Sequence, residues 1–273
     1  MALSLECRDL CFTYSGKHIL KGISFRADPG KFYAILGRNG SGKTTLLHCL
    51  NGILRPGAGQ VIIRSTPISE LSQKEIARQI SLVPQEHIDI FPFKVIDVVV
   101  MGRAPFIGVT QSPSNKDYDL AWAALNTLNA CNLARKNFNR ISGGERQIVL
   151  LASALAQSTP FMLLDEPTNH LDFNNQYHLL SRIKHLCQTR KLCVMATMHD
   201  PNMAMLFADH VIMIKDGMVL ENGPAREVMT ADHIGRLYDT QAAAVPITSD
   251  HSLFLPRMLL TACAGEEKPI CPQ

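Results

Sequence analysis

The sequence predicts an α/β fold, and three observations lead to this prediction. First, Phe161–Leu164 and Leu192–Thr197 are near-continuous apolar runs, which are typical of parallel strands buried on both faces. Second, Gln176–Cys187 between them has a helical period, so the three elements read as a strand–helix–strand unit. Third, the apolar run Phe32–Leu36 leads directly into glycines and then into a helical pattern over Lys43–Ile53.

The first third of the chain reads as short strands joined by turns. Turn signals at Ser15-Gly16 and Asp28-Pro29-Gly30 separate three strand candidates, which are Leu3–Arg8, Ile19–Arg26 and Gln60–Arg64. The helix that follows the glycines is predicted to pack on one face, because its apolar residues recur at helical spacing: Leu46, Leu47, Leu50 and Ile53.

The middle third, from about residue 91 to 157, has a mainly helical period and is predicted to be a helical insertion. A helix is expected over Asp119–Ala130, after a loop-rich stretch at Ala104–Asn115. The last third returns to α/β alternation. Val211–Lys215 and Met218–Glu221 flank Asp216-Gly217 and predict a hairpin, and the tail from about Ala262 is expected to be poorly ordered.

Composition excludes several classes of protein. The 273 residues carry 27 Lys+Arg against 24 Asp+Glu, and a net charge of +3 is too small to predict nucleic acid as the main partner. No apolar stretch is suited to cross a membrane, and charged residues at the N-terminus argue against a signal peptide, so we expect the cytoplasm. The eight scattered cysteines favour reduced thiols rather than disulfides or zinc.

A phosphate-binding loop is predicted between Phe32–Leu36 and the first helix. Eight consecutive residues match the pattern G-x-x-x-x-G-K-[ST]: Gly37, Arg38, Asn39, Gly40, Ser41, Gly42, Lys43 and Thr44. Thr45 follows and is expected to bind the nucleotide with them. Glycines let the backbone wrap around phosphates, and successive N–H groups with the helix N-terminus supply positive potential. Lys43 is expected to reach the β- and γ-phosphates of ATP, and Thr44 to offer its hydroxyl to Mg²⁺.

Two carboxylates follow the apolar strand Phe161–Leu164, at the end where α/β sheets bind ligands. Asp165 is expected to hold Mg²⁺, through water. Glu166 is expected to polarise a water molecule for attack on the γ-phosphate. The pair is a weak signal alone, and the phosphate loop strengthens it.

The run from Arg140 to Gln147 resembles the signature motif of ATP-binding cassette (ABC) ATPases, and other motifs of that family follow in order. The resemblance implies that Tyr14 stacks on adenine, Gln85 lies in the Q-loop, Asp172 lies in the D-loop and His199 is the switch histidine. Each has a simpler alternative: a strand aromatic for Tyr14, a surface amide for Gln85, a helix start for Asp172 and an ordinary loop histidine for His199.

The resemblance covers about residues 3–230 and implies a P-loop NTPase fold of the ABC type. It implies an ATPase domain over residues 1–230, with an N-terminal antiparallel β-subdomain and a helical subdomain inserted over about 91–157. A short extension over residues 231–273 would follow, with a flexible end.

The signature motif departs from the usual Leu-Ser-Gly-Gly-Gln at two positions, where Ile141 replaces Leu and Glu145 replaces Gln. Ser142 and Glu145 also form a capping box, so we expect Glu145 to face backbone more than phosphate. In the family, two cassettes dimerise head to tail. The resemblance therefore implies that Ser142, Gly143, Gly144 and Glu145 of one copy close on the ATP held by Lys43 of another.

The resemblance is closest to importer ATPases for iron–siderophore, haem and vitamin B12, on Val100-Met101-Gly102-Arg103, the run from Pro167 to Gln176 and His199-Asp200-Pro201-Asn202. It implies catalytic roles for Glu166, His199, Gln85 and Lys43, and Mg²⁺ ligands from Thr44, Gln85 and Asp165. Molybdate or tungstate import is the alternative. Two further alternatives are a soluble ABC ATPase without a role in transport and a soluble P-loop kinase.

Partners follow from the same resemblance. They are a second copy of the chain, integral membrane permease subunits and, indirectly, an extracytoplasmic substrate-binding protein, which would put the chain at the cytoplasmic face of the membrane. A groove for the permease is predicted after Gln85, from Phe91, Pro92, Phe93, Val95 and Ile96. The alternative is that these apolar residues are the core of the helical insertion.

Overall fold

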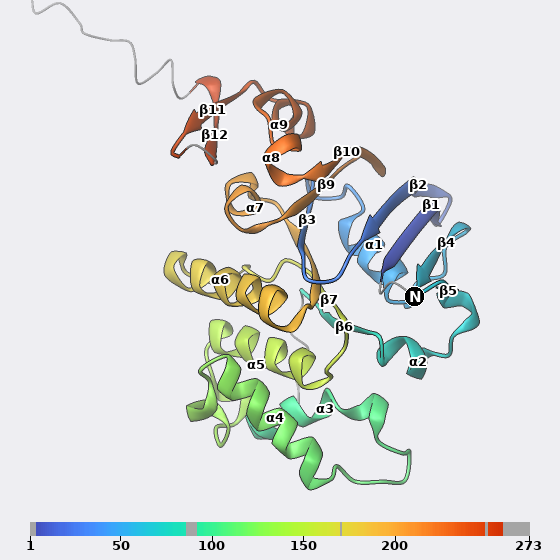
Figure 1. Ribbon diagram of the computed structural model, residues 1–273, viewed down its shortest axis with the longest axis vertical. Coiled ribbons are helices and arrows are strands. Elements are labelled where there is room, and N and C mark those ends of the chain that lie inside the picture. Colours follow the sequence, from blue (N-terminus) through green and yellow to red (C-terminus); the bar gives the residue numbers. More distant parts are fainter. Residues whose placement is uncertain (1–3, 86–91, 170, 249–250, 259–273) are drawn as a thin grey trace, which may run out of the picture.

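The protein, described here by a computed structural model, combines three sheets with flanking helices (Figure 1). The structure describes residues 4–85, 92–169, 171–248 and 251–258. A six-stranded sheet has the order β10-β9-β3-β8-β7-β6, a four-stranded sheet the order β2-β1-β4-β5, and β11 pairs with β12. Antiparallel and mixed sheets with helices confirm the predicted α/β fold.

The six-stranded sheet is parallel from β6 to β9, and β10 joins β9 as an antiparallel edge strand. Its strands are β3 (Phe32–Leu36), β6 (Ile80–Val83), β7 (Phe161–Leu164), β8 (Cys193–Met198), β9 (His210–Lys215) and β10 (Met218–Pro224). Every residue of β3, β7 and β8 is buried, as their continuous apolar runs predict. The hairpin of β9 and β10 is also as predicted.

The N-terminal sheet is antiparallel and packs beside the large one. It contains β1 (Leu5–Tyr14), β2 (Lys17–Ala27), β4 (Ala58–Ile63) and β5 (Thr66–Pro67). β1 extends beyond the predicted Arg8 because its pairing with β2 and β4 continues across register shifts. At that irregularity Asp9 has φ +47°. The regular alternation of buried and exposed residues breaks there, directly after the predicted end of the strand at Arg8.

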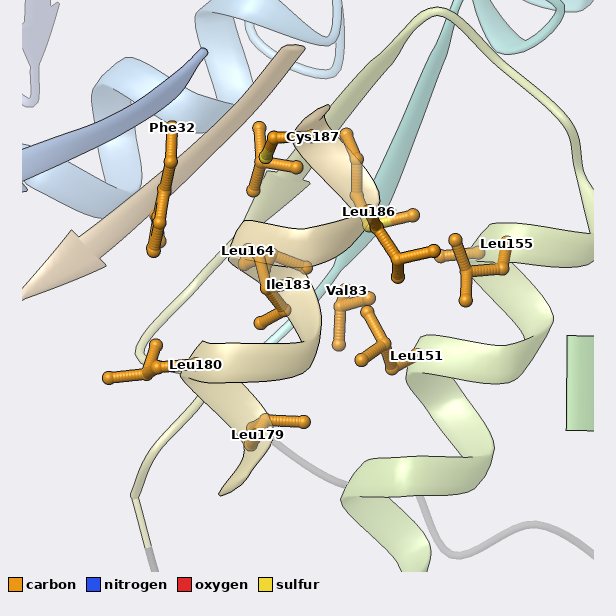
Figure 2. Close-up of a cluster of buried hydrophobic side chains, with 14 of the residues drawn as sticks. Phe32, Val83, Leu151, Leu155, Leu164, Leu179, Leu180, Ile183, Leu186 and Cys187 are labelled. Carbon is orange, nitrogen blue, oxygen red and sulfur yellow. The ribbon is translucent and has the colours of Figure 1, made fainter. Parts of the chain in front are cut away.

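Two apolar clusters cover the two faces of the large sheet. Alternate residues of β3 divide between them: Phe32, Ala34 and Leu36 face one cluster, whereas Tyr33 and Ile35 face the other. The second cluster includes α1 (Lys43–Leu50) and the N-terminal sheet. The first includes α6 (Phe173–Arg190), whose buried face packs toward α5 and the sheet in Figure 2.

The helices α3 (Val95–Met101), α4 (Asn115–Thr127) and α5 (Gly143–Ala156) follow β6 and precede β7 in the chain. They pack on one another below the sheet in Figure 1. A short helix α2 (Gln73–Ala77) precedes β6, and 3-10 turns cover Ile68–Glu70, Ala104–Phe106, Cys131–Leu133 and Phe138–Arg140. In the described residues, no helix has the length and apolar character needed to cross a bilayer.

Three predicted helices have shifted ends, and capping residues account for the shifts. α1 stops at Leu50 rather than Ile53 because Gly52 has φ +69°, a left-handed conformation that ends a helix. α4 begins at Asn115 because Ser114 and Asp117 form a capping box. α6 begins at Phe173 because the Asp172 carboxylate accepts a hydrogen bond from the Asn175 N–H, at 2.8 Å.

The elements that follow β10 lie at one end of the molecule, next to a helix that follows β8. α7 (Pro201–Phe207) follows β8, and α8 (Ala225–Val228), α9 (Ala231–Tyr238), β11 (Ala242–Pro246) and β12 (Ser252–Pro256) follow β10. Figure 1 shows α8, α9 and the small hairpin grouped beyond α7. The tail predicted from about Ala262 lies outside the described residues.

Gly102 provides a test of how the helical segment packs. A Cβ atom added there would lie 2.1 Å from the carbonyl oxygen of Ser153 in α5, far inside contact distance. We expect Gly102→Ala to lower the free energy of unfolding by about 1–3 kcal/mol, because backbone atoms must move apart. Urea denaturation measures this change. Gly143→Ala is the matched control, since a Cβ there meets nothing within 4 Å; equal effects of both changes would contradict the packing described.

Candidate active site

The glycine-rich loop between β3 and α1 is tightly enclosed. A Cβ atom on Gly37 would lie 2.4 Å from the Ile214 carbonyl oxygen and 2.6 Å from the Ser41 Oγ. Gly42, which precedes α1, has φ +102° and a Cβ there would lie 2.9 Å from Leu20. Only glycine satisfies both positions, because one lacks space and the other needs a left-handed backbone.

Lys43 is a buried cation held by backbone carbonyls. Its side chain is almost inaccessible, and Nζ donates hydrogen bonds to the carbonyl oxygens of Gly37, at 2.8 Å, and Arg38, at 3.1 Å. Burial lowers the pKa of Lys43, whereas the nearby carboxylates of Glu166 and Asp165 raise it. The Oγ of Ser41 beside it is buried and has no hydrogen-bond partner among the described residues. A donor without a partner next to a buried ammonium group suits a polyanionic ligand.

The start of α1 adds backbone donors to the same place. Within the part of the chain that the structure describes, no side chain caps its first turn, and that turn contains no acidic residue. Its N–H groups are therefore available to a ligand. Thr44 is exposed and Thr45 is partly buried in that turn, whereas Asn39 and Gly40 are exposed in the loop. This arrangement can bind phosphate groups.

Asp165 and Glu166 follow β7 and are oriented by Thr197 at the end of β8. The Thr197 Oγ1 donates a hydrogen bond to Asp165 Oδ1, at 2.6 Å, and accepts one from the Glu166 N–H, at 2.8 Å. Thr197 is fully buried and Asp165 is 3% exposed. Glu166 has φ +46°, a conformation that non-glycine residues seldom adopt. The bonded hydroxyl therefore fixes the Asp165 carboxylate and the Glu166 backbone in one arrangement.

The Glu166 carboxylate lies among side chains from its own loop and from two other segments. Its Oε2 accepts a hydrogen bond from Gln85 Nε2, at 3.1 Å, and another from Asn169 Nδ2. His199 Nδ1 lies 4.0 Å from the same oxygen. The structure therefore brings together five residues that the sequence predicts to belong to the ATP site: Lys43, Gln85, Asp165, Glu166 and His199. A carboxylate in this position can accept a proton from a water molecule beside a bound phosphate.

The oxygen atoms near Asp165 fit a magnesium ion. Mg²⁺ prefers oxygen ligands and keeps several waters when it binds with phosphates. Gln85 engages Glu166 through its amide nitrogen, and no hydrogen bond to its amide oxygen occurs within the described residues. That oxygen, the Asp165 carboxylate and the Thr44 hydroxyl are the ligand types that such an ion requires.

Tyr14 and Arg38 lie at exposed positions. Tyr14 ends β1 opposite Lys17, and 67% of its surface is exposed, so it is not the half-buried strand aromatic of the simpler reading. A flat exposed ring is available to stack on a base. Arg38 points to the C-terminal part of the chain and forms an exposed ion pair with Asp239, at 2.7 Å.

The Glu145 side chain faces backbone, as the capping box predicts. Its Oε2 accepts a hydrogen bond from the Ser142 N–H, at 2.9 Å, while the Glu145 N–H donates to Ser142 Oγ, at 3.2 Å. Oε1 pairs with Lys136 Nζ, at 3.2 Å. These partners, first among them the Ser142 N–H, lower the pKa of Glu145. The charge that replaces the usual Gln is therefore already matched by a cation.

The signature residues do not join the phosphate loop of their own chain. In the part of the chain that the structure describes, no hydrogen bond or ion pair links Ser142, Gly143 or Gly144 to Lys43 or Glu166. Ser142 and Gly144 instead line a cavity with Leu171 and Asn175. Asp172 caps α6, which matches the simpler alternative for that residue.

The helical segment carries a separate apolar groove. Phe93 lines it, together with Val100, Met101, Ile107, Val109 and Tyr118, and Lys74 and Asp97 lie at its sides. The groove predicted from sequence is therefore only partly correct. Val95 is fully buried in the core and Ile96 packs against it, because both lie on the inner face of α3, while Pro92 is exposed and Phe91 lies outside the described residues.

Arg103 holds the loop that borders this groove. Its guanidinium is buried, pairs with Asp117 at 3.1 Å and donates to the Ala156 carbonyl oxygen at 3.1 Å. It also lies over the Phe106 ring, 4.1 Å from the centroid. The pairing with Ser114 and Arg103 lowers the pKa of Asp117 to about 2. The loop from Ala104 onward is thus fixed to α4 and α5.

Two residues that contribute to the site were not proposed from sequence. Thr197 gave no signal as a buried hydroxyl in an apolar strand, although it comes two residues before His199. Asn169 lies in the run from Pro167 to Gln176, to which the sequence assigns no individual role for this residue, and its amide donates to the Glu166 carboxylate. A polar residue at the carboxyl end of an otherwise apolar buried strand is the signal that would have identified Thr197.

Comparisons with known proteins agree with this geometry. The ABC transporter family model matches residues 20–169. A "Probable iron chelatin transport ATP-binding protein" of Helicobacter pylori is 38% identical over 242 residues, covering 88% of this chain and 95% of the relative. A hemin import ATP-binding protein of Burkholderia lata is 35% identical, covering 81% and 87%. A solved structure of a candidate metal-chelate type ABC transporter, in an inward-facing conformation, is 31% identical with TM-score 0.82, covering 93% and 97%.

Thr197→Val tests the arrangement of the two carboxylates. The change removes the hydroxyl and leaves Asp165 and the Glu166 N–H without that partner, so we expect the free energy of unfolding to fall by about 1–3 kcal/mol. Urea denaturation is the measurement. Thr197→Ser keeps the hydroxyl and is expected to lose less than half as much; if Ser and Val variants are equally destabilised, packing of the methyl group rather than hydrogen bonding is the cause.

Proposed function

Because the chain belongs to the ABC transporter family of ATP hydrolases, we propose that it is the ATPase subunit of an importer that takes up a metal chelate. One observation above all supports this function. The carboxylate of Glu166 lies among Gln85, Asn169 and His199, beside a buried lysine at the start of a helix. This is the arrangement that hydrolysis of a bound nucleoside triphosphate requires.

In the proposed reaction, Lys43 exchanges its bonds to the Gly37 and Arg38 carbonyls for the β- and γ-phosphates of ATP. Backbone N–H groups of residues 38–45 bind the same phosphates. Glu166 accepts a proton from the water that attacks the γ-phosphate, and His199 contacts that phosphate from the opposite loop. Gln85 holds Glu166 through its amide nitrogen.

Thr44, Asp165 and the amide oxygen of Gln85 would hold Mg²⁺. When bound with ATP, the ion supplies positive charge against the β- and γ-phosphate oxygens. Asp165 is kept ready for this role by the Thr197 hydroxyl, which occupies one of its oxygens. Tyr14, exposed at the end of its hairpin, would stack on the adenine.

We propose that two copies complete each ATP site head to tail. Within the described residues of one chain, no hydrogen bond or ion pair joins the Ser142 loop to Lys43, and Lys43 does not line the cavity beside Ser142. This supports the arrangement, because the signature residues then need a nucleotide from another copy. Ser142, Gly143 and Gly144 of one copy would contact the γ-phosphate held by the other. Glu145 would act there through its cap on the helix, and Asp172 would lie in the loop between the two sites.

Membrane permease subunits are the proposed second partner, which would place the chain at the cytoplasmic face of the membrane. The apolar groove beside Phe93 supports such docking, since Val109 is fully exposed and Met101 is 45% exposed at its border. A short amphipathic helix of a permease would fit its apolar lining between Lys74 and Asp97. An extracytoplasmic binding protein would take part only through the permease.

The proposed cargo class rests on the relatives. Iron chelatin transport, hemin import and metal-chelate transport are named for proteins that match most of this chain. The residues of the ATP site contact nucleotide or partner subunits rather than cargo, so they do not distinguish one chelate from another. None of the relatives named above is described as a molybdate or tungstate importer.

Glu166→Gln tests the assigned base. We expect turnover of ATP to fall at least about a hundredfold, because an amide cannot accept the proton from water. ATP binding, measured by equilibrium dialysis, is expected to stay within about threefold of the unchanged chain. Glu75→Gln is the control, since Glu75 only caps α2. Turnover of the Glu166 variant near that of the control would remove Glu166 from the proposed role.

Val109→Asp tests the proposed docking groove. The side chain is fully exposed, so the variant should fold normally and keep its own ATPase activity, while a buried charge at the interface should weaken permease binding about tenfold or more. The readout is the amount of permease retained by the tagged chain in detergent. Ile247→Asp changes an exposed residue far from the groove and serves as control. Equal retention by both variants would contradict docking there.

Reconstitution tests the function as a whole. Membrane subunits that co-purify with the chain are inserted into liposomes with their binding protein, and ATP hydrolysis is measured with each candidate cargo. We expect stimulation by a ferric chelate, haem or cobalamin. Hydrolysis stimulated by molybdate, or activity indifferent to every membrane partner, would contradict the proposed importer.

A further inference from the structure

The C-terminal part of the chain, from α9 to β12, contacts the segment that carries His199. This part lies beyond the elements that supply the ATP-site residues, yet it reaches two of their loops. Tyr238, the last residue of α9, donates a hydrogen bond from its hydroxyl to the His199 carbonyl oxygen, at 2.7 Å. Burial, together with the nearby Asp200 carboxylate, raises the pKa of Tyr238, so its hydroxyl remains a donor at every physiological pH.

A second contact fixes the same segment three residues later. The Phe254 N–H of β12 donates to Asn202 Oδ1, at 2.7 Å, and Asn202 Nδ2 donates to the Phe254 carbonyl oxygen, at 3.3 Å. Phe254 is buried in the main core, so β12 is anchored to the body of the protein. Asp200 caps α7 by accepting the Asn202 N–H, at 2.8 Å. The backbone from His199 to Asn202 is thus held at both ends.

The phosphate loop receives a third contact from the same turn. Asp239 follows Tyr238, adopts φ +55° and pairs with Arg38 at 2.7 Å as well as with Lys215. The side chains of Arg38 and Asp239 are each more than half exposed. An exposed pair of this kind contributes little free energy. We therefore assign the main positional effect to Tyr238 and Asn202 rather than to Asp239.

The His199 side chain depends on this backbone support. About half of it is exposed, and among the described residues its ring makes no hydrogen bond; its Nδ1 lies 4.0 Å from Glu166 Oε2. Because no hydrogen bond fixes the ring within the described residues, the position of its backbone sets the region that the imidazole can reach. Small shifts of that backbone would change the distance from the imidazole to a bound γ-phosphate, and reaction rates are sensitive to such shifts.

We propose that Tyr238 is a positioning residue for ATP hydrolysis, and that the C-terminal part of the chain acts on turnover by holding the His199 backbone. This inference rests on the proposed function, since it assumes that His199 contacts the γ-phosphate. It gives the extension a role in turnover, in addition to its contribution to folding. It also makes turnover sensitive to any partner that displaces α9 or β12.

Tyr238→Phe in the full-length chain is the test, because it removes one hydroxyl and preserves the ring. We expect kcat for ATP hydrolysis to fall about three- to tenfold, the effect of one lost hydrogen bond, while KM for ATP stays within about twofold. Tyr177→Phe is the matched control. Its ring packs between Phe173 and Phe207, and its hydroxyl forms no hydrogen bond within the described part of the chain. An unchanged kcat in Tyr238→Phe would overturn the proposal.

A double-mutant cycle with His199→Ala separates positioning from general stability. If Tyr238 acts through His199, Tyr238→Phe should have less than a twofold effect in the His199→Ala background, measured by single-turnover hydrolysis. A three- to tenfold loss that persists in that background would overturn the proposal. If His199→Ala alone leaves kcat unchanged, the proposed function of His199 fails instead, which keeps the two failures distinct.

Asn202→Leu keeps the proposal testable if Tyr238→Phe folds poorly. Leucine has the same branched shape as asparagine, with methyl groups in place of the amide oxygen and nitrogen. The change removes both bonds to Phe254, so kcat should again fall at constant KM. Thermal melts of each variant are recorded, and rates are compared well below the lowest melting temperature. Loss of kcat in proportion to loss of folded protein would overturn the proposal, and loss of kcat with a fully folded chain would support it.

Discussion

The candidate site depends on one structural constraint, the side-by-side pairing of the parallel strands β3, β8 and β7. Leu36 pairs with Met198, and Leu164 pairs with Ala196, so the three strands end near the same edge of the sheet. The phosphate loop follows β3, His199 follows β8, and Asp165 follows β7. Because parallel strands place their carboxyl ends together, residues separated by more than 100 positions in the chain meet at this edge. The burial of all three strands makes this alignment rigid.

The site combines fixed and loosely held groups. Asp165 and the Glu166 backbone are fixed by one buried hydroxyl, and Lys43 is held by loop carbonyls that a phosphate can replace. In contrast, the Glu166 carboxylate meets Gln85, Asn169 and His199 from loops with fewer constraints. Such a division suits a site in which Asp165 and the Glu166 backbone stay in place while the side chains around the Glu166 carboxylate respond to nucleotide. The contacts of Tyr238 and Asn202 belong to the second group, because they hold a loop rather than a strand.

Much of this site could be predicted from the sequence because its residues lie in motifs with fixed local geometry. Gly37 and Gly42 are specified by a close approach and a left-handed backbone, and Glu145 by a capping box, so short spacing rules suffice. Thr197 could not be found by such rules, since its partners Asp165 and Glu166 lie on another strand and the pairing depends on sheet order. Tyr238 was missed for the same reason, because its bond to His199 spans 39 positions. Helix ends differ from the predicted ones where capping residues such as Ser114 lie outside the apolar period. Val95 is predicted in a groove because an apolar side chain does not reveal which face of α3 it occupies.

The most direct test of the central claim is a structure of the Glu166→Gln chain with ATP and Mg²⁺. We expect two copies arranged head to tail, with the γ-phosphate between Lys43 and His199 of one copy and Ser142 of the other. A nucleotide bound away from Lys43, or a site completed by Ser142 of the same chain, would contradict it.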